Sequence, residues 1–182
     1  LTEGDRLSFV MTTDGDKDVM LVTSLGMAVR YNETLVRCIG KNGQGSRSML
    51  LRPEDSIAAV LAIDAESDPS ILVITELGKG KKTSASEYRS TAGRCVKGQR
   101  TINTLKREVS GKIVTAVALS DNDEILVLTN KGKMMRCNLD TLKNKSKVTQ
   151  ANNIVSLDDG DTVQTVSVVP LSNKDFEEDF TE

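Results

Sequence analysis

Basic side chains recur at a fixed place in this sequence. Arg30, Lys82 and Arg136 each stand four residues after a glycine, and each glycine ends the same pattern of apolar residues, Thr and two variable residues. Because the side chains of a strand alternate between its two faces, an equal offset places the three bases on equivalent faces. Lys and Arg gathered in this way are suited to an anionic partner such as phosphate.

The segments around these positions add further bases. Residues 78–107 alone hold nine Lys or Arg against the single acid Glu87, and such a block of one sign indicates an electrostatic binding surface. The candidate DNA-binding residues are Arg30, Arg37, Lys41, Arg47, Lys79, Lys81, Lys82, Arg89, Arg94, Lys97, Arg100, Lys131, Lys133, Arg136, Lys143, Lys145 and Lys147.

A belt of bases favours duplex DNA held through its backbone, with affinity from counterion release and little reading of bases. Aromatic residues make up only 3% of the chain, which argues against single strands stacked on aromatic rings. Two other interpretations stay open. The bases could form a solvated surface, or a basic face that binds an acidic protein.

The sequence contains no pattern typical of a catalytic site or a metal site. The chain has no His, and its three cysteines are far apart, without a C-x-x-C pair. These features argue against zinc and disulfides and favour reduced thiols in the cytoplasm. The glycine turns do not extend to a phosphate-binding loop, and no apolar run approaches a membrane span. We expect no catalytic residue, metal or cofactor in this chain, and no membrane partner. The first residue is Leu, so we expect the chain to begin inside a longer protein.

The elements that position the bases form a long-period repeat. The turn glycines Gly26, Gly78 and Gly132 are 52 and 54 residues apart, and a fixed pattern at such a period indicates a repeat architecture. The predicted units are residues 18–63, 69–119 and 123–169. Residues 1–12 are predicted to be the closing strand of a preceding unit, and residues 172–182 form an acidic tail.

Each unit is predicted to contain four short strands joined by turns, which is typical of all-β proteins. Four-stranded repeats of this length form propeller-like discs of about four to eight blades. Three units are too few for a disc. The chain is therefore predicted to be half of a disc, and the alternative is that two copies complete one another. Open strand edges also favour self-association.

Several stretches together resemble a known family. They are VTSLGMAVR, ITELGKGKKTSASEYRSTAGRCVKGQRTIN and LTNKGKMMR, with the acidic-turn strands EGDRLSFV and DGDTVQTVSVV. In this order they resemble the C-terminal DNA-wrapping domain of the DNA gyrase A subunit, which is a β-pinwheel of six blades, and the chain looks like its last three blades. The A-type subunit of topoisomerase IV is the alternative.

The resemblance implies a role in DNA wrapping that supports ATP-dependent negative supercoiling, in a bacterial cytoplasm and at the nucleoid. It implies as partners the rest of the A subunit, together with the gyrase B subunit, and it implies that ATP and Mg²⁺ bind elsewhere in the enzyme. The family's Q-R-R-G-G-K-G box has no intact copy here; its nearest counterpart, residues 39–45, keeps Lys41, Gly43 and Gly45. The family's catalytic tyrosine belongs to an upstream domain, and Tyr31 and Tyr88 match no catalytic residue.

Overall fold

Apolar strands that end in Thr and a glycine turn build three similar hairpins. In the first, β1 (Lys17–Thr23) pairs with β2 (Met27–Asn32); in the second, β4 (Ser70–Thr75) pairs with β5 (Lys79–Ser84); in the third, β8 (Glu124–Thr129) pairs with β9 (Met134–Asn138). The computed structural model describes residues 3–64, 66–102, 110–147 and 149–170.

The Thr-x-x-Gly pattern closes each hairpin. The amide of Gly26 donates to the carbonyl of Thr23 at 3.0 Å, and the buried Thr23 hydroxyl accepts from the Met27 amide at 3.1 Å. Gly26 has a φ of +85°, a conformation that side chains with a Cβ adopt only at a cost. The constant residues of the repeat therefore form the turn, whereas the sequence of the strand that follows differs between the units.

A longer strand lies on the other side of each first strand. β3 (Ile57–Asp64) pairs with β1, β7 (Ile113–Leu119) with β4, and β11 (Val163–Val169) with β8, all antiparallel. Short 3₁₀ turns, η1 (Glu33–Leu35) and η2 (Ala85–Glu87), follow β2 and β5. The prediction of an all-β protein is confirmed.

The second and third units each contain the four predicted strands, but the fourth strand of a sheet comes from the next unit. β6 (Gln99–Arg100) belongs to the second unit but pairs with β2 of the first, and β10 (Asn152–Asn153) belongs to the third unit but pairs with β5 of the second. The sheet orders are β3-β1-β2-β6, β10-β5-β4-β7 and β11-β8-β9. Antiparallel pairing leaves β2 and β5 with a free edge, and the loop of the next unit is long enough to reach it.

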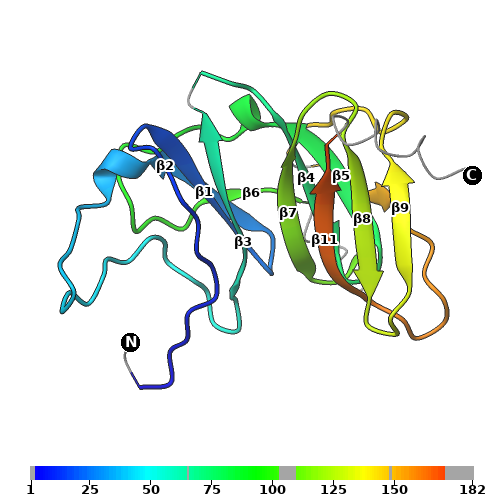
Figure 1. The fold of residues 1–182 in the computed structure, drawn as a ribbon, viewed down its shortest axis with the longest axis horizontal. Helices are drawn as coiled ribbons and strands as arrows, with labels where there is room; N and C mark the ends of the chain where they lie inside the picture. The colour runs from blue at the N-terminus through cyan, green and yellow to red at the C-terminus, as the bar shows by residue number, and fades with distance from the viewer. Residues whose placement is uncertain (1–2, 65, 103–109, 148, 171–182) are drawn as a thin grey trace, which may run out of the picture.

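The three sheets stand side by side in a row, with the first sheet at one end and the third at the other (Figure 1). β3 packs beside β7, and β7 packs beside β11. The apolar core lies between successive sheets. Met20 and Val22 of β1 share one cluster with Ile71 and Val73 of β4.

The opposite face of β4 enters a second cluster, where Leu72 and Ile74 meet Ile125 and Val127 of β8. The middle sheet is therefore apolar on both faces.

Residues 5–12 form no strand in the described chain, although a strand was predicted there. Leu7 and Val10 are 70% and 78% exposed. A strand requires a partner, and no described residue offers one. That this segment closes a preceding blade stays a prediction. The predicted acidic tail lies outside the described residues.

Candidate nucleic-acid interface

Arg30 is the first correction to the predicted basic belt. Its side chain donates from Nε to Asp18 Oδ2 at 2.7 Å and from Nη1 to the carbonyl of Ala85 at 2.9 Å. The residue is only 7% exposed. Because Ala85 belongs to the second unit, Arg30 joins two units inside the protein and is not available to a phosphate.

The equivalent Arg136 of the third unit is paired in the same way but at the surface. Its Nε donates to Glu124 at 2.5 Å, and 43% of its side chain is exposed. In both units the acid stands twelve residues before the base. The middle unit has Ser70 at that position, twelve residues before its base Lys82. The acids at this fixed offset are a sequence signal that would have identified the recurring base as part of an ion pair.

Lys81 is the second correction. It is 1% exposed, and its Nζ donates to the carbonyls of Ser146 at 3.0 Å and Lys147 at 2.5 Å. It stands opposite Val73 in the hairpin register, on a face that packs into the core. Burial lowers the pKa of Lys81 to about 8, with the nearby Lys145 adding to this effect and Glu87 opposing it. Lys81 is thus an internal anchor for the loop that leads to β10.

Lys131 and Lys133 lie exposed on the turn of the third hairpin, next to acceptors. Lys131 Nζ donates to the carbonyl of Asp159 at 2.6 Å, and Lys133 Nζ lies 3.2 Å from an oxygen of Asp158. The nearby carboxylate of Asp158 offsets part of the positive charge that this turn would present to DNA.

The loop bases behave differently from those of the hairpins. Among the described residues, none of them forms an ion pair with a carboxylate; the group comprises Arg37, Lys41, Arg47, Arg89, Arg94, Lys97, Arg100, Lys143, Lys145 and Lys147. Most are exposed, and Arg94, Lys145 and Lys147 are half-buried. Their charge is therefore available to a ligand.

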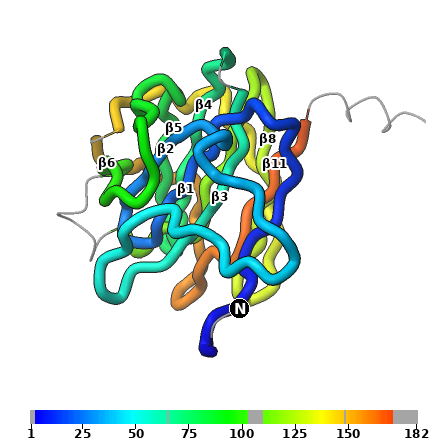
Figure 2. Tube along the Cα trace, turned by 90° about the vertical axis from the view of Figure 1, so that its left-hand side faces the viewer, coloured from blue at the N-terminus to red at the C-terminus, as the bar shows by residue number. Residues whose placement is uncertain are grey.

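The loops of the second and third units lead into β6 and β10, the strands at one edge of their sheets. We name this edge, with residues 88–100 and 142–153, the outer edge. Arg94 donates to the carbonyl of Arg47 at 3.4 Å, which brings the loop of the first unit against it. Lys147 Nζ reaches Gln99 Oε1 at 2.9 Å, so the loops of the second and third units meet. Figure 2 shows β6 at one side of the first sheet and β3 at the other.

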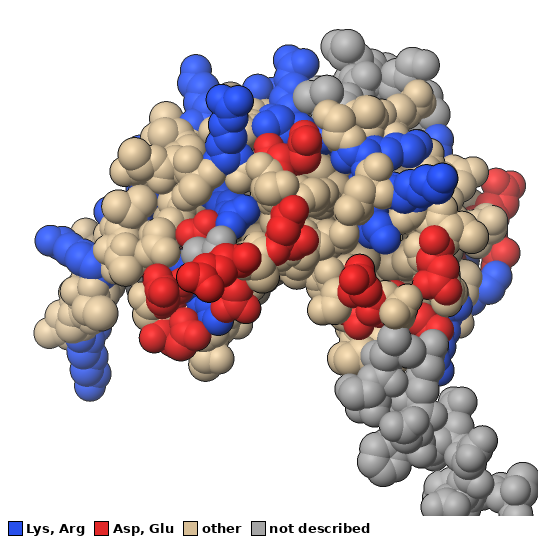
Figure 3. Space-filling model, turned by 90° about the horizontal axis from the view of Figure 1, so that it is seen from above, with Lys and Arg blue, Asp and Glu red and all other residues tan. Residues whose placement is uncertain are grey.

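Acids gather elsewhere, on the links that follow the long strands. Asp64 ends β3 and Asp68 lies on the link after it, and Asp121 and Asp123 lie on the link after β7. Both links lie at the upper end of Figure 1. In Figure 3, which looks onto that end, Asp and Glu cluster on the lower half of the face and Lys and Arg predominate along the upper margin. The two signs of charge are thus separated, and the outer edge carries an unpaired positive charge.

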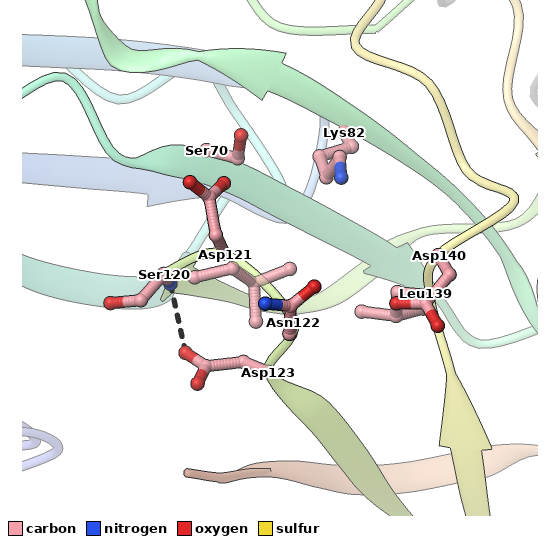
Figure 4. A pocket seen from close by; sticks show the side chains of 9 residues that line it. Ser70, Lys82, Ser120, Asp121, Asn122, Asp123, Leu139 and Asp140 are labelled. Atoms are coloured by element: carbon pink, nitrogen blue, oxygen red, sulfur yellow. Dashed lines mark hydrogen bonds between the residues drawn. The ribbon is translucent and has the colours of Figure 1, made fainter. Parts of the chain in front are cut away.

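Lys82 and Lys79 are half-buried, and Lys82 lies in acidic surroundings. It lines a hollow of about 380 Å³ together with Asp121, Asp123 and Asp140 (Figure 4). The amide of Ser120 donates to Asp123 at 2.8 Å and shapes the turn on one side. Three carboxylates disfavour a phosphate here, so Lys82 is a weaker candidate than the loop bases.

Three exposed bases of the described residues fall outside the predicted set: Arg6 near the start of the chain, and Arg52 and Lys112 on the turns before β3 and β7. A plain count of bases would have included them. Among the described residues, no cluster of His, Cys, Asp and Glu could hold a metal ion, and no helix has the length and apolar character needed to cross a bilayer.

The comparisons with known proteins agree with one another. The family model "DNA gyrase C-terminal domain, beta-propeller" matches residues 17–64, 69–120 and 123–170. The chain belongs to this family. The DNA gyrase A subunit of Haloquadratum walsbyi is 33% identical over 175 residues, which are 96% of this chain and 20% of that protein. The chain thus spans about a fifth of the curated relatives it matches.

Solved structures give the same result. "Structure of DNA gyrase A C-terminal domain" matches with a TM-score of 0.74 and 27% identity, over 84% of this chain and 50% of that one. "Crystal structure of the C-terminal domain of DNA topoisomerase IV" matches with a TM-score of 0.84 and 26% identity, over 93% and 51%. The predicted β-pinwheel of repeated units is confirmed.

Proposed function

We propose that this chain binds duplex DNA along its outer edge, without sequence preference, as the C-terminal domain of a gyrase-type A subunit. One observation carries the proposal: the loop bases of the outer edge are unpaired, whereas the acids lie on the links at the ends of β3 and β7. A curved basic surface without aromatic platforms suits the backbone of a bent duplex.

Binding to a labelled duplex over a range of salt concentrations tests the proposal. We expect log K to fall linearly with log salt, with a slope of about −0.9 for each phosphate contact, and equal affinity for duplexes of unrelated sequence. The double variant Lys97→Glu/Arg100→Glu weakens binding strongly. Lys133→Gln, which removes a base already beside Asp158, serves as the matched control and changes it little.

The wider role follows from the family and forms part of the same proposal. In a full-length gyrase-type protein that carries this domain, wrapping would present a second DNA segment to the enzyme and support ATP-dependent negative supercoiling. The partners are then the B subunit, together with the rest of the A subunit, in the cytoplasm at the nucleoid, with ATP and Mg²⁺ bound outside this domain.

A second candidate is the topoisomerase IV counterpart of the gyrase A subunit, because the solved domain of that enzyme aligns over 93% of this chain. The reconstituted enzyme distinguishes them. Gyrase-type activity introduces negative supercoils into relaxed circular DNA, whereas an enzyme that only relaxes and decatenates supports the second candidate. A protein-binding face stays the third interpretation: it is favoured if the Glu variants leave DNA affinity unchanged and abolish a protein contact.

A further inference from the structure

Two lysines cross the boundary between the second and third units in opposite directions. Lys81 of β5 donates to the carbonyls of Ser146 and Lys147 in the third unit, at 3.0 and 2.5 Å. Lys147 donates back to the second unit, to the carbonyl of Glu87 at 2.7 Å and to Gln99 Oε1 at 2.9 Å. Each ammonium group is therefore held by oxygen atoms of the other unit. We name Lys81 and Lys147 the lysine clasp.

The lysine clasp holds a loop that carries several of the candidate bases. We name residues 143–147 the clasped loop, and its bases are Lys143, Lys145 and Lys147. The backbone adds a third contact, because the amide of Lys145 donates to the carbonyl of Lys82 at 2.8 Å. The clasped loop is thus fixed against β5 of the second unit before any ligand binds.

A lysine at the position of Lys81 is unexpected on packing grounds. The residue is 1% exposed, and the first and third units have the apolar Val29 and Met135 at the equivalent positions. Burying an ammonium group costs free energy unless an opposite charge lies near it. Glu87 on η2 favours the charge on Lys81 but is itself exposed, and Lys145 of the clasped loop opposes that charge. The positive charge of Lys81 is therefore only partly compensated within the protein.

The same holds for the neighbouring lysines. Lys145 Nζ donates to Asn152 Oδ1 at 2.8 Å, and Lys147 contacts only a carbonyl and an amide oxygen. Among the described residues, neither they nor Lys81 form an ion pair with a carboxylate. An anion beside the clasped loop would reduce the repulsion between these lysines and stabilise the charged form of Lys81. A phosphate of the DNA backbone supplies such a charge.

We propose that the clasped loop is a phosphate site at the junction of the second and third units, and that Lys81 is its positioning residue. The inference rests on the proposed function and assigns one site within the outer edge. Lys81 touches no phosphate, because it is buried. It keeps the clasped loop in the conformation that binds DNA, so the loop does not have to be ordered when the duplex arrives.

The variant Lys81→Met tests the positioning role. Met135 occupies the equivalent position in the third unit, so the variant is expected to keep the fold, and circular dichroism verifies this. We expect the affinity for a labelled duplex at fixed salt to fall about fivefold to tenfold, because the loop must then be ordered on binding. The slope of log K against log salt stays unchanged, since the number of phosphate contacts is the same. Lys112→Met is the matched control: it removes an exposed lysine before β7, at the opposite edge of the sheet, and changes the affinity little.

A double variant tests whether the two lysines hold the same loop. Lys147→Met removes the other half of the lysine clasp. If both halves hold one loop, the double variant Lys81→Met/Lys147→Met loses less affinity than the product of the two single losses. Single losses that multiply would show independent contributions and would contradict the clasp.

Proton uptake is a measurement that a purely structural role of Lys81 would not change. Burial, together with Lys145, lowers the pKa of Lys81 to about 8 in the free protein, and a phosphate beside the loop raises this pKa again. Calorimetric titration with duplex in two buffers of different ionisation enthalpy measures the protons taken up. We expect about half a proton near pH 8.5 if the pKa rises by about one, and almost none near pH 6.5. Lys81→Met abolishes this uptake.

The outcomes distinguish this inference from the proposed function. If the unmodified chain does not bind duplex, or binds it independently of salt, both are overturned. If the unmodified chain binds with the expected salt dependence but Lys81→Met has the same affinity, or the same proton uptake, only the phosphate site is overturned. A shallower salt slope in Lys81→Met would also overturn it, because Lys81 would then contact a phosphate itself.

Discussion

Arg30 and Asp18 form a buried ion pair across the first hairpin, with 2.7 Å between Nε and Oδ2. Each side chain is less than a tenth exposed. Arg30 also reaches the carbonyl of Ala85 in the second unit. The pair therefore fixes the position of one sheet relative to the next.

We expect Asp18→Ala to destabilise the fold by about 3–5 kcal/mol, because it leaves the buried guanidinium of Arg30 without its counter-charge. Urea unfolding followed by circular dichroism measures the change. Asp158→Ala removes an exposed partner of Lys133 and, as the matched control, should cost about 1 kcal/mol or less. Equal losses of unfolding free energy in the two variants would show that the buried ion pair stabilises the fold no more than the exposed one.

Lys81 is expected to make stability depend on pH. Its pKa is about 8 in the folded protein, against 10.5 for an ordinary lysine. Between these values the unfolded chain binds more protons than the folded one, so the free energy of unfolding rises with pH through this window. The total rise attributable to Lys81 is about 3 kcal/mol, and it is absent below pH 8.

The variant Lys81→Met isolates this contribution, because Met135 occupies the equivalent position in the third unit. We expect the difference in unfolding free energy between the native chain and the variant to change between pH 8 and 10.5. Thermal melts of both proteins across this range provide the measurement. Parallel curves would show that Lys81 is protonated alike in both states.

DNA binding should separate internal lysines from those of the outer edge. Neutralising Lys97 and Arg100 together should make the slope of log K against log salt shallower by about 1.8, if each contacts one phosphate. Lys81→Met, which also removes a base, should leave the slope unchanged because Lys81 does not reach the surface. A loss of slope in Lys81→Met with the fold intact would contradict the assignment of Lys81 as an internal anchor.

Two turn glycines with similar backbone angles should differ in their tolerance of substitution. Gly132→Ala, with open space around it, should cost about 1–2 kcal/mol for its left-handed conformation. Gly78→Ala places a Cβ 2.5 Å from the Val155 carbonyl and should cost about 3 kcal/mol or more, because the backbone must shift. Urea titrations at a concentration that keeps the chain monomeric compare them. Similar costs would mean that the segment after β10 does not press on the Gly78 turn.

The repeat and its hairpins could be predicted from sequence, because Thr23, Gly26 and their equivalents are needed for a local turn. The pairing of β6 and β10 with strands of the preceding units could not be predicted, because a two-residue strand has no periodicity and its partner is determined by tertiary packing. That the basic belt binds DNA stays a prediction. Charge alone does not distinguish Arg30, which faces Asp18 inside the protein, from Arg89, which faces solvent. The burial of Lys81 could have been predicted from the apolar residues at the equivalent positions of the other units, Val29 and Met135.

Because β6 and β10 complete the sheets of the preceding units, the sheets must be completed in the order in which the chain is synthesised. The first hairpin emerges from the ribosome with an open edge, and that edge is covered only after Gln99 and Arg100 have been made. The free edge of β5 in the second hairpin is likewise covered only after Asn152 and Asn153 have been made. During translation, the sheet of each unit is therefore completed only when part of the next unit has been synthesised. A pause after residue 98 would leave the edge of β2 free to pair with another strand.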